Sequence, residues 1–242
     1  MKLTNAEILA ICKILLDSRA FTKKEIDSMV ERLIECCAPK NNQELVKKLI
    51  GNEQYHYIEL TRKSEFLDDM WKIGEAISRQ KYIEIDYQGI QGSSVKTRKL
   101  KPVAIMFSEY YFYLCAFIEN DKVKENFTVL DDAFPTIYRI DRIQRLEILE
   151  DSFKVIYNDR FEEGEFRKRV QFMFGGKLRR VKFEYSGYSV ESVLDRLPTA
   201  KILDERKHED GKRTIYTISA EVFGDGIDMW LRSQGEYINV LN

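Results

Sequence analysis

The sequence lacks the features of membrane proteins, metalloproteins and common enzyme families. No apolar run approaches the roughly 18 residues of a membrane-spanning helix, and the N-terminus lacks the apolar core of a signal peptide, so we expect a cytoplasmic protein. The only histidines are His56 and His208, and no Cys-x-x-Cys occurs, which argues against a metal site. G-x-S-x-G, phosphate-loop and dinucleotide-binding motifs are also missing, so we expect neither catalysis nor a cofactor.

The cysteines do not indicate a disulfide-stabilised fold. Cys36 and Cys37 are adjacent in the sequence, and adjacent cysteines rarely pair because the resulting geometry is strained. A chain of 242 residues can bury enough apolar surface to fold without a covalent cross-link. We therefore interpret Cys12, Cys36, Cys37 and Cys115 as reduced, buried, small hydrophobic residues.

The charge balance excludes a protein that is polycationic overall. The chain has 39 basic and 40 acidic residues and a formal net charge of -1, so a nucleic-acid surface would require local segregation of charge. Residues 96–101, 139–145 and 160–182 are such basic runs. Each run alone is typical of a solvated face. Three such runs in a neutral chain are also consistent with a surface that binds a carboxylate, a phosphate or a nucleic-acid strand. The guanidinium of arginine can donate two parallel hydrogen bonds to a carboxylate or phosphate group.

Residues 1–80 show the apolar spacing of helices. We predict four helices, which begin near Thr4, Thr22, Glu44 and Ser64. A capping box opens the second helix, and Pro39 ends it. The third helix is short, covers residues 44–50 and is closed by Gly51. Trp71 falls on the apolar, buried face of the fourth helix.

Residues 81–150 change to the two-residue alternation of β-strands, with Ile83 and Ile85 between acidic neighbours. Further strands are predicted over residues 95–107, 110–118, 125–130 and 136–141, with a hairpin turn at 119–121. Pro102 should break or bend the second strand. Short strands at regular spacing predict a small β-barrel, which would also remove exposed sheet edges.

Residues 151–242 begin with a connector of mixed charge that extends to about residue 170. The remainder has the order strand, helix, strand, strand, helix, strand, at residues 180–185, 190–197, 200–207, 213–222, 227–233 and 237–241. This order is the ferredoxin-like βαββαβ pattern. We therefore expect an α+β protein with three parts, residues 1–80, 81–150 and 151–242.

An aromatic run occupies the predicted strand at residues 110–118. Strand alternation places Tyr111 and Tyr113 on one face, with Tyr110 and Phe112 on the other. Packing in a core accounts for most of these side chains. A tyrosine beside arginines on a small barrel also fits the stacking of nucleobases with neutralisation of phosphate. The residues alone support both interpretations.

Four short motifs resemble those of the WYL domain family and occur in the same order. Phe112-Tyr113-Leu114 resembles the Trp-Tyr-Leu tripeptide, with phenylalanine in place of tryptophan. Residues 82–87 resemble the opening strand, residues 98–102 the Arg-x-Leu-x-Pro motif, and residues 138–143 the closing motif. Residues 229–235 resemble the extension that usually follows a WYL domain.

The resemblance implies an SH3- or Sm-like barrel in a bacterial transcriptional regulator. Family members typically have a winged helix-turn-helix head, a helical linker, the barrel and the extension. The barrel is thought to bind nucleic acid or a nucleotide and so to control DNA binding by the head. The positions that match the motifs make Arg98, Tyr113, Arg139 and Arg142 the candidate ligand site. Phenylalanine at position 112 excludes a role that requires an indole N–H, but not a packing role.

Residues 1–60 show no basic recognition helix followed by a β-wing, so we expect DNA to be bound through a separate N-terminal head. We interpret residues 1–80 as a helical linker that supports a homodimer, because regulators that read two half-sites are commonly two-fold symmetric. In one alternative these helices bind DNA themselves, although residues 23–37 mix acidic and basic side chains. In the other, the chain is a nucleotide-processing enzyme, for which no motif is present.

Overall fold

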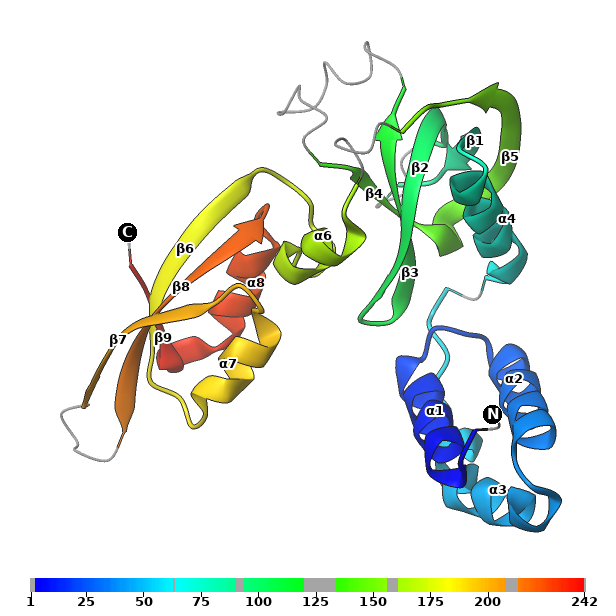
Figure 1. The fold of residues 1–242 in the computed structure, drawn as a ribbon, viewed down its shortest axis with the longest axis horizontal. Coiled ribbons are helices and arrows are strands. Elements are labelled where there is room, and N and C mark those ends of the chain that lie inside the picture. Colours follow the sequence, from blue (N-terminus) through cyan, green and yellow to red (C-terminus); the bar gives the residue numbers. More distant parts are fainter. Residues whose placement is uncertain are drawn as a thin grey trace. The chain divides into compact units, whose positions relative to one another are not determined.

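The computed structural model describes residues 3–62, 64–89, 94–119, 134–155, 161–207 and 213–241. It is an α+β protein with N-terminal helices and antiparallel sheets (Figure 1). The chain divides into two compact units. The first contains residues 1–72, 107–113 and 139–141, and the second contains residues 73–106, 114–138 and 142–242. None of the helices in the described ranges is long and apolar enough to cross a lipid bilayer.

The first unit begins with three helices, α1 (Asn5–Ser18), α2 (Lys23–Cys37) and α3 (Lys40–Tyr55). The predicted capping box at Thr22 is present, and a second capping box opens α1. The predicted bounds of the third helix were wrong, because α3 begins directly after Pro39 and continues through Gly51. A glycine inside a helix costs only about 1 kcal/mol relative to alanine, so an otherwise helical sequence continues through it.

Helix α4 (Leu67–Ser78) begins three residues later than Ser64, the predicted cap. The prediction that Trp71 is buried was also wrong, since its side chain is 72% exposed while Ile73 and Ala76 are buried. The interpretation of the cysteines holds for Cys12 and Cys115 but not for Cys36, which is exposed near the end of α2. Helical periodicity therefore predicted where these helices lie in the sequence. Which side chains of each helix are buried depends on the segments that pack against it.

The first sheet has five strands in the order β4-β3-β2-β1-β5. Its strands are β1 (Lys81–Tyr87), β2 (Lys96–Ser108), β3 (Tyr111–Ile118), β4 (Thr136–Arg139) and β5 (Ile143–Ser152). The predicted alternation in β1 is confirmed, because Ile83 and Ile85 are fully buried. Strand β2 runs through Pro102 without interruption. A single 3₁₀ turn, η1 (Ile140–Arg142), joins β4 to β5.

Strand β5 was not predicted, and it pairs antiparallel with β1. Its exposed charged residues mask the alternation, because Glu147 and Glu150 fall on opposite faces. The predicted strand at residues 125–130 lies outside the described residues, as does most of the turn at 119–121. Within the described ranges β4 and β5 form the two ends of the sheet, so a closed barrel is not confirmed.

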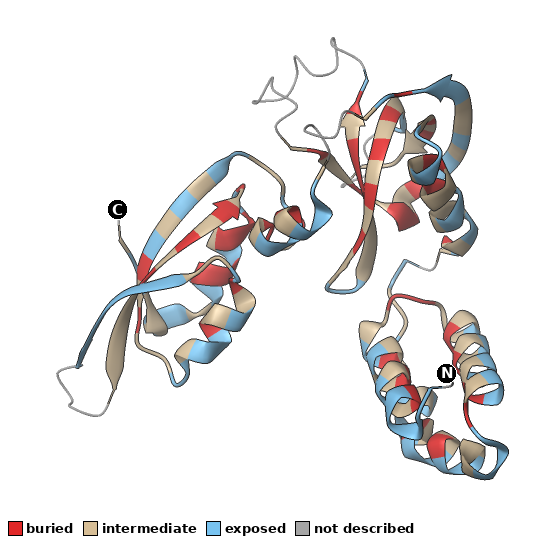
Figure 2. Cartoon of the chain, viewed as in Figure 1, coloured by how far each residue is buried: buried red, intermediate tan, exposed pale blue. Residues whose placement is uncertain are grey.

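The C-terminal elements follow the predicted order. They are β6 (Leu178–Tyr185), α7 (Val190–Arg196), β7 (Lys201–Lys207), β8 (Thr214–Phe223), α8 (Gly226–Ser233), the 3₁₀ turn η3 (Gly235–Tyr237) and β9 (Ile238–Leu241). The strands form an antiparallel sheet in the order β7-β8-β6-β9. Both helices cover one face of this sheet (Figure 1), where Phe183, Ile218 and Trp230 belong to a common buried core. All residues of β7 are exposed (Figure 2).

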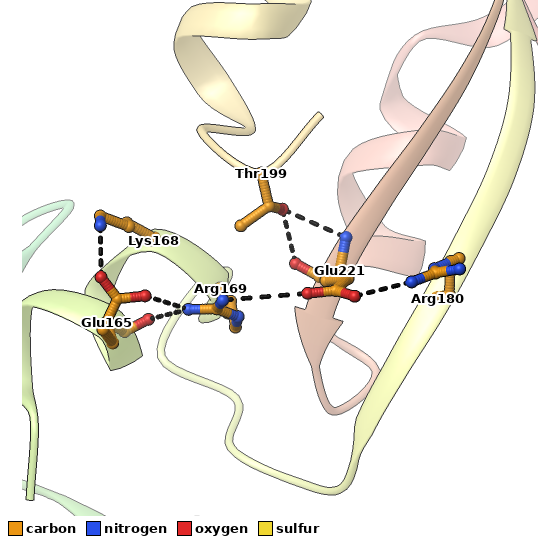
Figure 3. A network of polar contacts seen from close by, with 6 residues as sticks. All are labelled: Glu165, Lys168, Arg169, Arg180, Thr199 and Glu221. Atoms are coloured by element: carbon orange, nitrogen blue, oxygen red, sulfur yellow. Dashed lines mark hydrogen bonds and ion pairs between the residues drawn. The ribbon is translucent and has the colours of Figure 1, made fainter. Parts of the chain in front are cut away.

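The predicted connector contains a helix, α6 (Glu163–Arg169), that is attached to the C-terminal sheet. Phe166 is buried and stacks on Phe223 of β8, with ring centroids 5.3 Å apart. Polar contacts reinforce this attachment (Figure 3), since the Arg169 guanidinium lies 3.8 Å from the Glu221 carboxylate, which also pairs with Arg180. The charge of Arg180, acting mainly through its hydrogen bond, lowers the pKa of Glu221. Helix α6 therefore belongs to the C-terminal fold.

Candidate functional site

The beginning of β3 presents two different faces, as strand alternation predicts. Tyr111 and Tyr113 lie on one face, where their rings meet edge-on with centroids 6.3 Å apart. Phe112 lies on the opposite face and contacts other phenylalanines. The residues involved belong to the first unit. The WYL-like tripeptide therefore combines one polar aromatic face with one hydrocarbon face.

Arg139, at the end of β4, joins the tyrosine face. Its guanidinium lies over the Tyr111 ring, 3.4 Å from the ring centroid. The same guanidinium donates two hydrogen bonds to Asp141, from Nε to Oδ1 at 3.0 Å and from Nη2 to Oδ2 at 2.6 Å. The exposed fractions of the two side chains are only 18% and 9%. Burial acts to lower the pKa of Arg139, because it disfavours the charged form. The hydrogen bonds to Asp141 and the charge of that carboxylate outweigh this effect, so the pKa of Arg139 is raised.

Tyr113 lies in the electrostatic field of this arginine. Burial raises the pKa of Tyr113 to about 12, and the positive charge of Arg139 opposes that rise. The hydroxyl is therefore protonated at neutral pH and can donate a hydrogen bond. We name Tyr111, Tyr113, Arg139 and Asp141 the tyrosine–arginine cluster. It combines an aromatic surface, a hydroxyl donor and a cation that is held in a fixed orientation.

The other face of β3 holds the N-terminal helices to the strand. Phe112 packs against Phe21, Phe66 and Phe107, with ring centroids 5.9, 5.5 and 5.0 Å away. Tyr57 positions Phe21 by donating a hydrogen bond of 2.9 Å to its backbone oxygen. We name Phe21, Phe66, Phe107 and Phe112 the phenylalanine cluster.

A narrow cleft lies where these two clusters meet, within the first unit. Phe21 and Phe66 line it from the N-terminal segment, and Tyr111, Phe112 and Asp141 line it from the sheet. Its free volume is about 10 Å³, which is room for a single water molecule. As it stands, the cleft has no room for a nucleotide.

Residues 70–148, from α4 into β5, match the family model of the WYL domain. The chain contains a WYL domain. The resemblance recognised in the four sequence motifs is thereby confirmed, and the tyrosine–arginine cluster lies inside the matched region. No curated protein matches the chain.

Solved structures similar to this chain include the proteasome accessory factor B/C (PafBC) of Arthrobacter aurescens and a CRISPR Cas-related protein. The PafBC match has 11% identity, a TM-score of 0.38 and covers 97% of this chain. This chain spans 30% of the PafBC chain. The CRISPR Cas-related match has 14% identity and a TM-score of 0.42, and covers 99% of this chain and 76% of the other.

The four predicted site residues of the WYL domain fall in two places. Tyr113 and Arg139 come together in the first unit, whereas Arg98 and Arg142 belong to the second. Arg98 lies on β2 opposite Ile85, and its positive charge acts on the buried Tyr138. Arg142 is half-buried in η1, where its backbone oxygen accepts a hydrogen bond from Gln88. Convergence of all four residues on one face stays a prediction.

Much of the positive charge in the three basic runs is neutralised in the folded chain. Arg145 of the second run pairs with Glu84, Asp86 and Glu147. In the other two runs, Lys99 pairs with Asp151, and Arg179 pairs with Asp225 and Asp228. A basic run in the sequence therefore does not become a basic surface when strand pairing brings carboxylates beside it.

Two members of the cluster were missed as site residues in the sequence. Tyr111 was placed on the correct face but was not assigned a role. Asp141 was left out of the candidate site, yet it binds Arg139. The spacing Arg139-x-Asp141 contained this signal, because the turn of η1 folds the carboxylate back toward the preceding strand.

Proposed function

We propose that this chain is the ligand-sensing region of a bacterial transcriptional regulator and has no catalytic activity. Its WYL domain binds a single-stranded nucleic acid or a nucleotide at the tyrosine–arginine cluster. The observation that carries this proposal is the half-buried Arg139 stacked on Tyr111 beside Tyr113, inside the matched WYL region. Exposed surface arginines bind anions without specificity, whereas a fixed and desolvated one favours a defined ligand.

The cluster supplies the contacts that a nucleotide requires. A base gains about 1 to 3 kcal/mol by stacking on an aromatic ring, so the tyrosines favour a base over a simple anion. The guanidinium favours a phosphate oxygen, and Asp141 keeps it in one orientation. Arg98 and Arg142 stay candidate phosphate contacts for a longer strand.

The phenylalanine cluster supports a route from ligand to regulation. Tyr113 and Phe112 are neighbours in β3, so a ligand that displaces one shifts the other. Phe112 contacts Phe21 and Phe66 of the N-terminal segment, and the cleft that they line has room for only one water molecule. Ligand binding would therefore open the cleft and move the N-terminal helices. These helices would transmit the change to a separate DNA-binding head, in a homodimer.

Two finer features of the fold belong to this proposal. The C-terminal elements have the order βαββαβ, and their antiparallel sheet has the order β7-β8-β6-β9, both of which support a ferredoxin-like domain. The short antiparallel strands of the WYL domain support an SH3- or Sm-like barrel.

The test is titration of labelled single-stranded DNA, single-stranded RNA and mononucleotides into the wild-type chain and its variants. Tyr113→Ala and Arg139→Ala should each weaken binding about tenfold, by loss of a stacking surface and of a charge-assisted contact. Wild-type binding should also weaken with added salt, because neutralised phosphates release counterions. The ligand recovered after incubation should be chemically identical to the ligand added, which checks that the chain does not convert it.

Matched controls are Tyr55→Ala and Arg79→Ala, which remove exposed side chains of α3 and of the segment after α4. Neither should change affinity. Equal affinities in the wild type, Tyr113→Ala and Arg139→Ala, with unchanged melting curves, would refute the proposed site. A light-scattering mass of 28.6 kDa, that of one chain, would contradict the homodimer.

A further inference from the structure

A second aromatic site lies in the C-terminal domain, outside the residues that match the WYL model. It is a cavity of about 530 Å³, a size typical of small-ligand pockets. Three segments form it, namely the β6–α7 loop, the beginning of β8 and η3. Tyr188, Tyr216 and Tyr237 line it together with Arg213 and Glu236. All of these residues lie in the second unit.

The loop that bears Tyr188 is held tightly. A Cβ atom at Gly187 would lie 2.2 Å from the Tyr185 hydroxyl oxygen, so a larger residue would require the Tyr185 side chain to move. The amide of Ser186 donates a hydrogen bond of 2.9 Å to the backbone oxygen of Tyr237, which ties the loop to η3. Tyr188 is nevertheless 94% exposed. The loop therefore presents a large aromatic side chain to solvent, where it adds nothing to a core.

Tyr188 and Tyr237 form one aromatic platform. Their ring centroids are 5.7 Å apart and the rings are tilted by 57°. The neighbouring Tyr188 side chain is the main cause that raises the pKa of Tyr237. The two rings already lie beside each other in the folded chain, which reduces the entropy lost on binding.

The charges beside the platform favour an anion at one end. Arg213 lines the cavity, and its positive charge acts on Tyr237. Lys207 donates a hydrogen bond of 3.3 Å to Thr214, another lining residue, so a second cation lies near the same end. Glu236, on η3, also lines the cavity and is exposed.

We infer that this tyrosine cleft is a second nucleotide-binding site, in which a base stacks on Tyr188 and Tyr237 and its phosphate faces Arg213. The inference rests on the proposed function for the class of ligand. The bound base and its phosphate could belong to a free nucleotide or to one nucleotide of a single strand. A proline-rich peptide also suits tyrosine-lined grooves, but two cations at one end favour a phosphate-bearing ligand.

The experiment uses photochemical cross-linking to the full chain. The probes are a bromouracil-substituted oligothymidylate and free bromo-dUMP, and peptide mass mapping locates the cross-links. We expect a cross-link at Tyr188 or Tyr237 that Tyr188→Ala abolishes, with an affinity loss of about fivefold to tenfold. Tyr188→Phe should keep most of the affinity, since it retains the ring. Cross-linking by the oligonucleotide alone would identify a strand as the source, and cross-linking by both probes a nucleotide unit.

Variants of the two charged residues sharpen the test. Arg213→Gln should weaken binding of either probe, and Glu236→Gln should strengthen it about twofold by removing a like charge. Tyr55→Ala is the matched control for an exposed tyrosine and should leave the cross-links unchanged. Melting curves of Tyr188→Ala should match the wild type, because the side chain is exposed.

The outcomes separate this inference from the proposed function. Cross-links at Tyr111 or Tyr113 alone would overturn the second site and support the first. Cross-links in the tyrosine cleft alone would do the reverse, and a complete lack of cross-links would overturn both. Binding of a proline-rich peptide that Tyr188→Ala abolishes, without any nucleotide cross-link, would also overturn the inference.

Discussion

The two faces of β3 differ in chemistry although their residues alternate along one strand. Phe112 contacts only aromatic hydrocarbon among the ring contacts described, in the phenylalanine cluster. Tyr111 and Tyr113, one residue to either side, meet a guanidinium and its carboxylate partner. Both faces are only partly buried. The first face gains stability from packing of its rings. The second face buries a charged group, which costs desolvation free energy and is not required for packing.

This difference shows how a short motif can serve two purposes. The hydrophobic effect rewards the phenylalanine face in proportion to its buried apolar area. Burial of an ion pair contributes little net stability, so a half-buried pair beside tyrosines is more consistent with a binding role. The comparison predicts that substitutions on the phenylalanine face affect folding most, and that those on the tyrosine face affect ligand binding and have a smaller effect on folding.

The largest effect is expected for Phe112→Ala. Removal of this ring takes away contacts to three other rings and leaves a void, which should lower the free energy of unfolding by about 3 kcal/mol. Chemical denaturation measures this loss, and proteolysis should show earlier cleavage within residues 1–72. Tyr55→Ala, which removes an exposed ring, is the control. Equal stability of Phe112→Ala and wild type would mean that the phenylalanine cluster does not hold the N-terminal segment.

A smaller effect is expected for Asp141→Asn, on the tyrosine face. It removes the Asp141 charge from the half-buried Arg139, which should cost about 2 kcal/mol of unfolding free energy, between the values for buried and surface pairs. The matched control is Glu147→Gln, which removes one carboxylate partner of the more exposed Arg145. It should cause no measurable change in the denaturation midpoint. If both variants lose the same stability, the two arginines do not differ as their burial indicates.

The smallest effect at neutral pH is expected for Tyr113→Phe, which keeps the ring and should leave the melting temperature nearly unchanged. At alkaline pH the two proteins should diverge. The folded-state pKa of Tyr113 is about 12, above the ordinary value of 10. The unfolded chain therefore loses this proton first, and wild-type stability falls as pH rises from 10 towards 12. The variant should lack this part of the decline in melting scans taken across that range.

Ultraviolet titration provides an independent check of the same residue. The difference between wild type and Tyr113→Phe should contain one tyrosinate transition near pH 12. A transition near the ordinary pKa of about 10 would mean that Tyr113 is not desolvated.

Local patterns allowed much of the fold to be predicted. The capping box at Thr22 and the alternation of Ile83 and Ile85 depend on neighbours within a few residues, so they were correct. The C-terminal order of strands and helices followed from the same local periodicities. Strand β5 was missed because its partner, β1, lies about sixty residues away in sequence and supplies the pairing that its own composition does not reveal.

For the candidate site, the sequence by itself determined the WYL motifs and the alternation that puts Tyr113 and Phe112 on opposite faces. Only the tertiary structure decided which carboxylates and rings surround each arginine. Arg139 and Arg145 are equivalent in a basic run, yet Arg139 meets Asp141 and a tyrosine ring, whereas Arg145 meets Glu84, Asp86 and Glu147. The physical reason is that electrostatic interactions depend on distance and burial. Pairing of remote strands and the turn at η1 set those distances, whereas spacing along the chain does not.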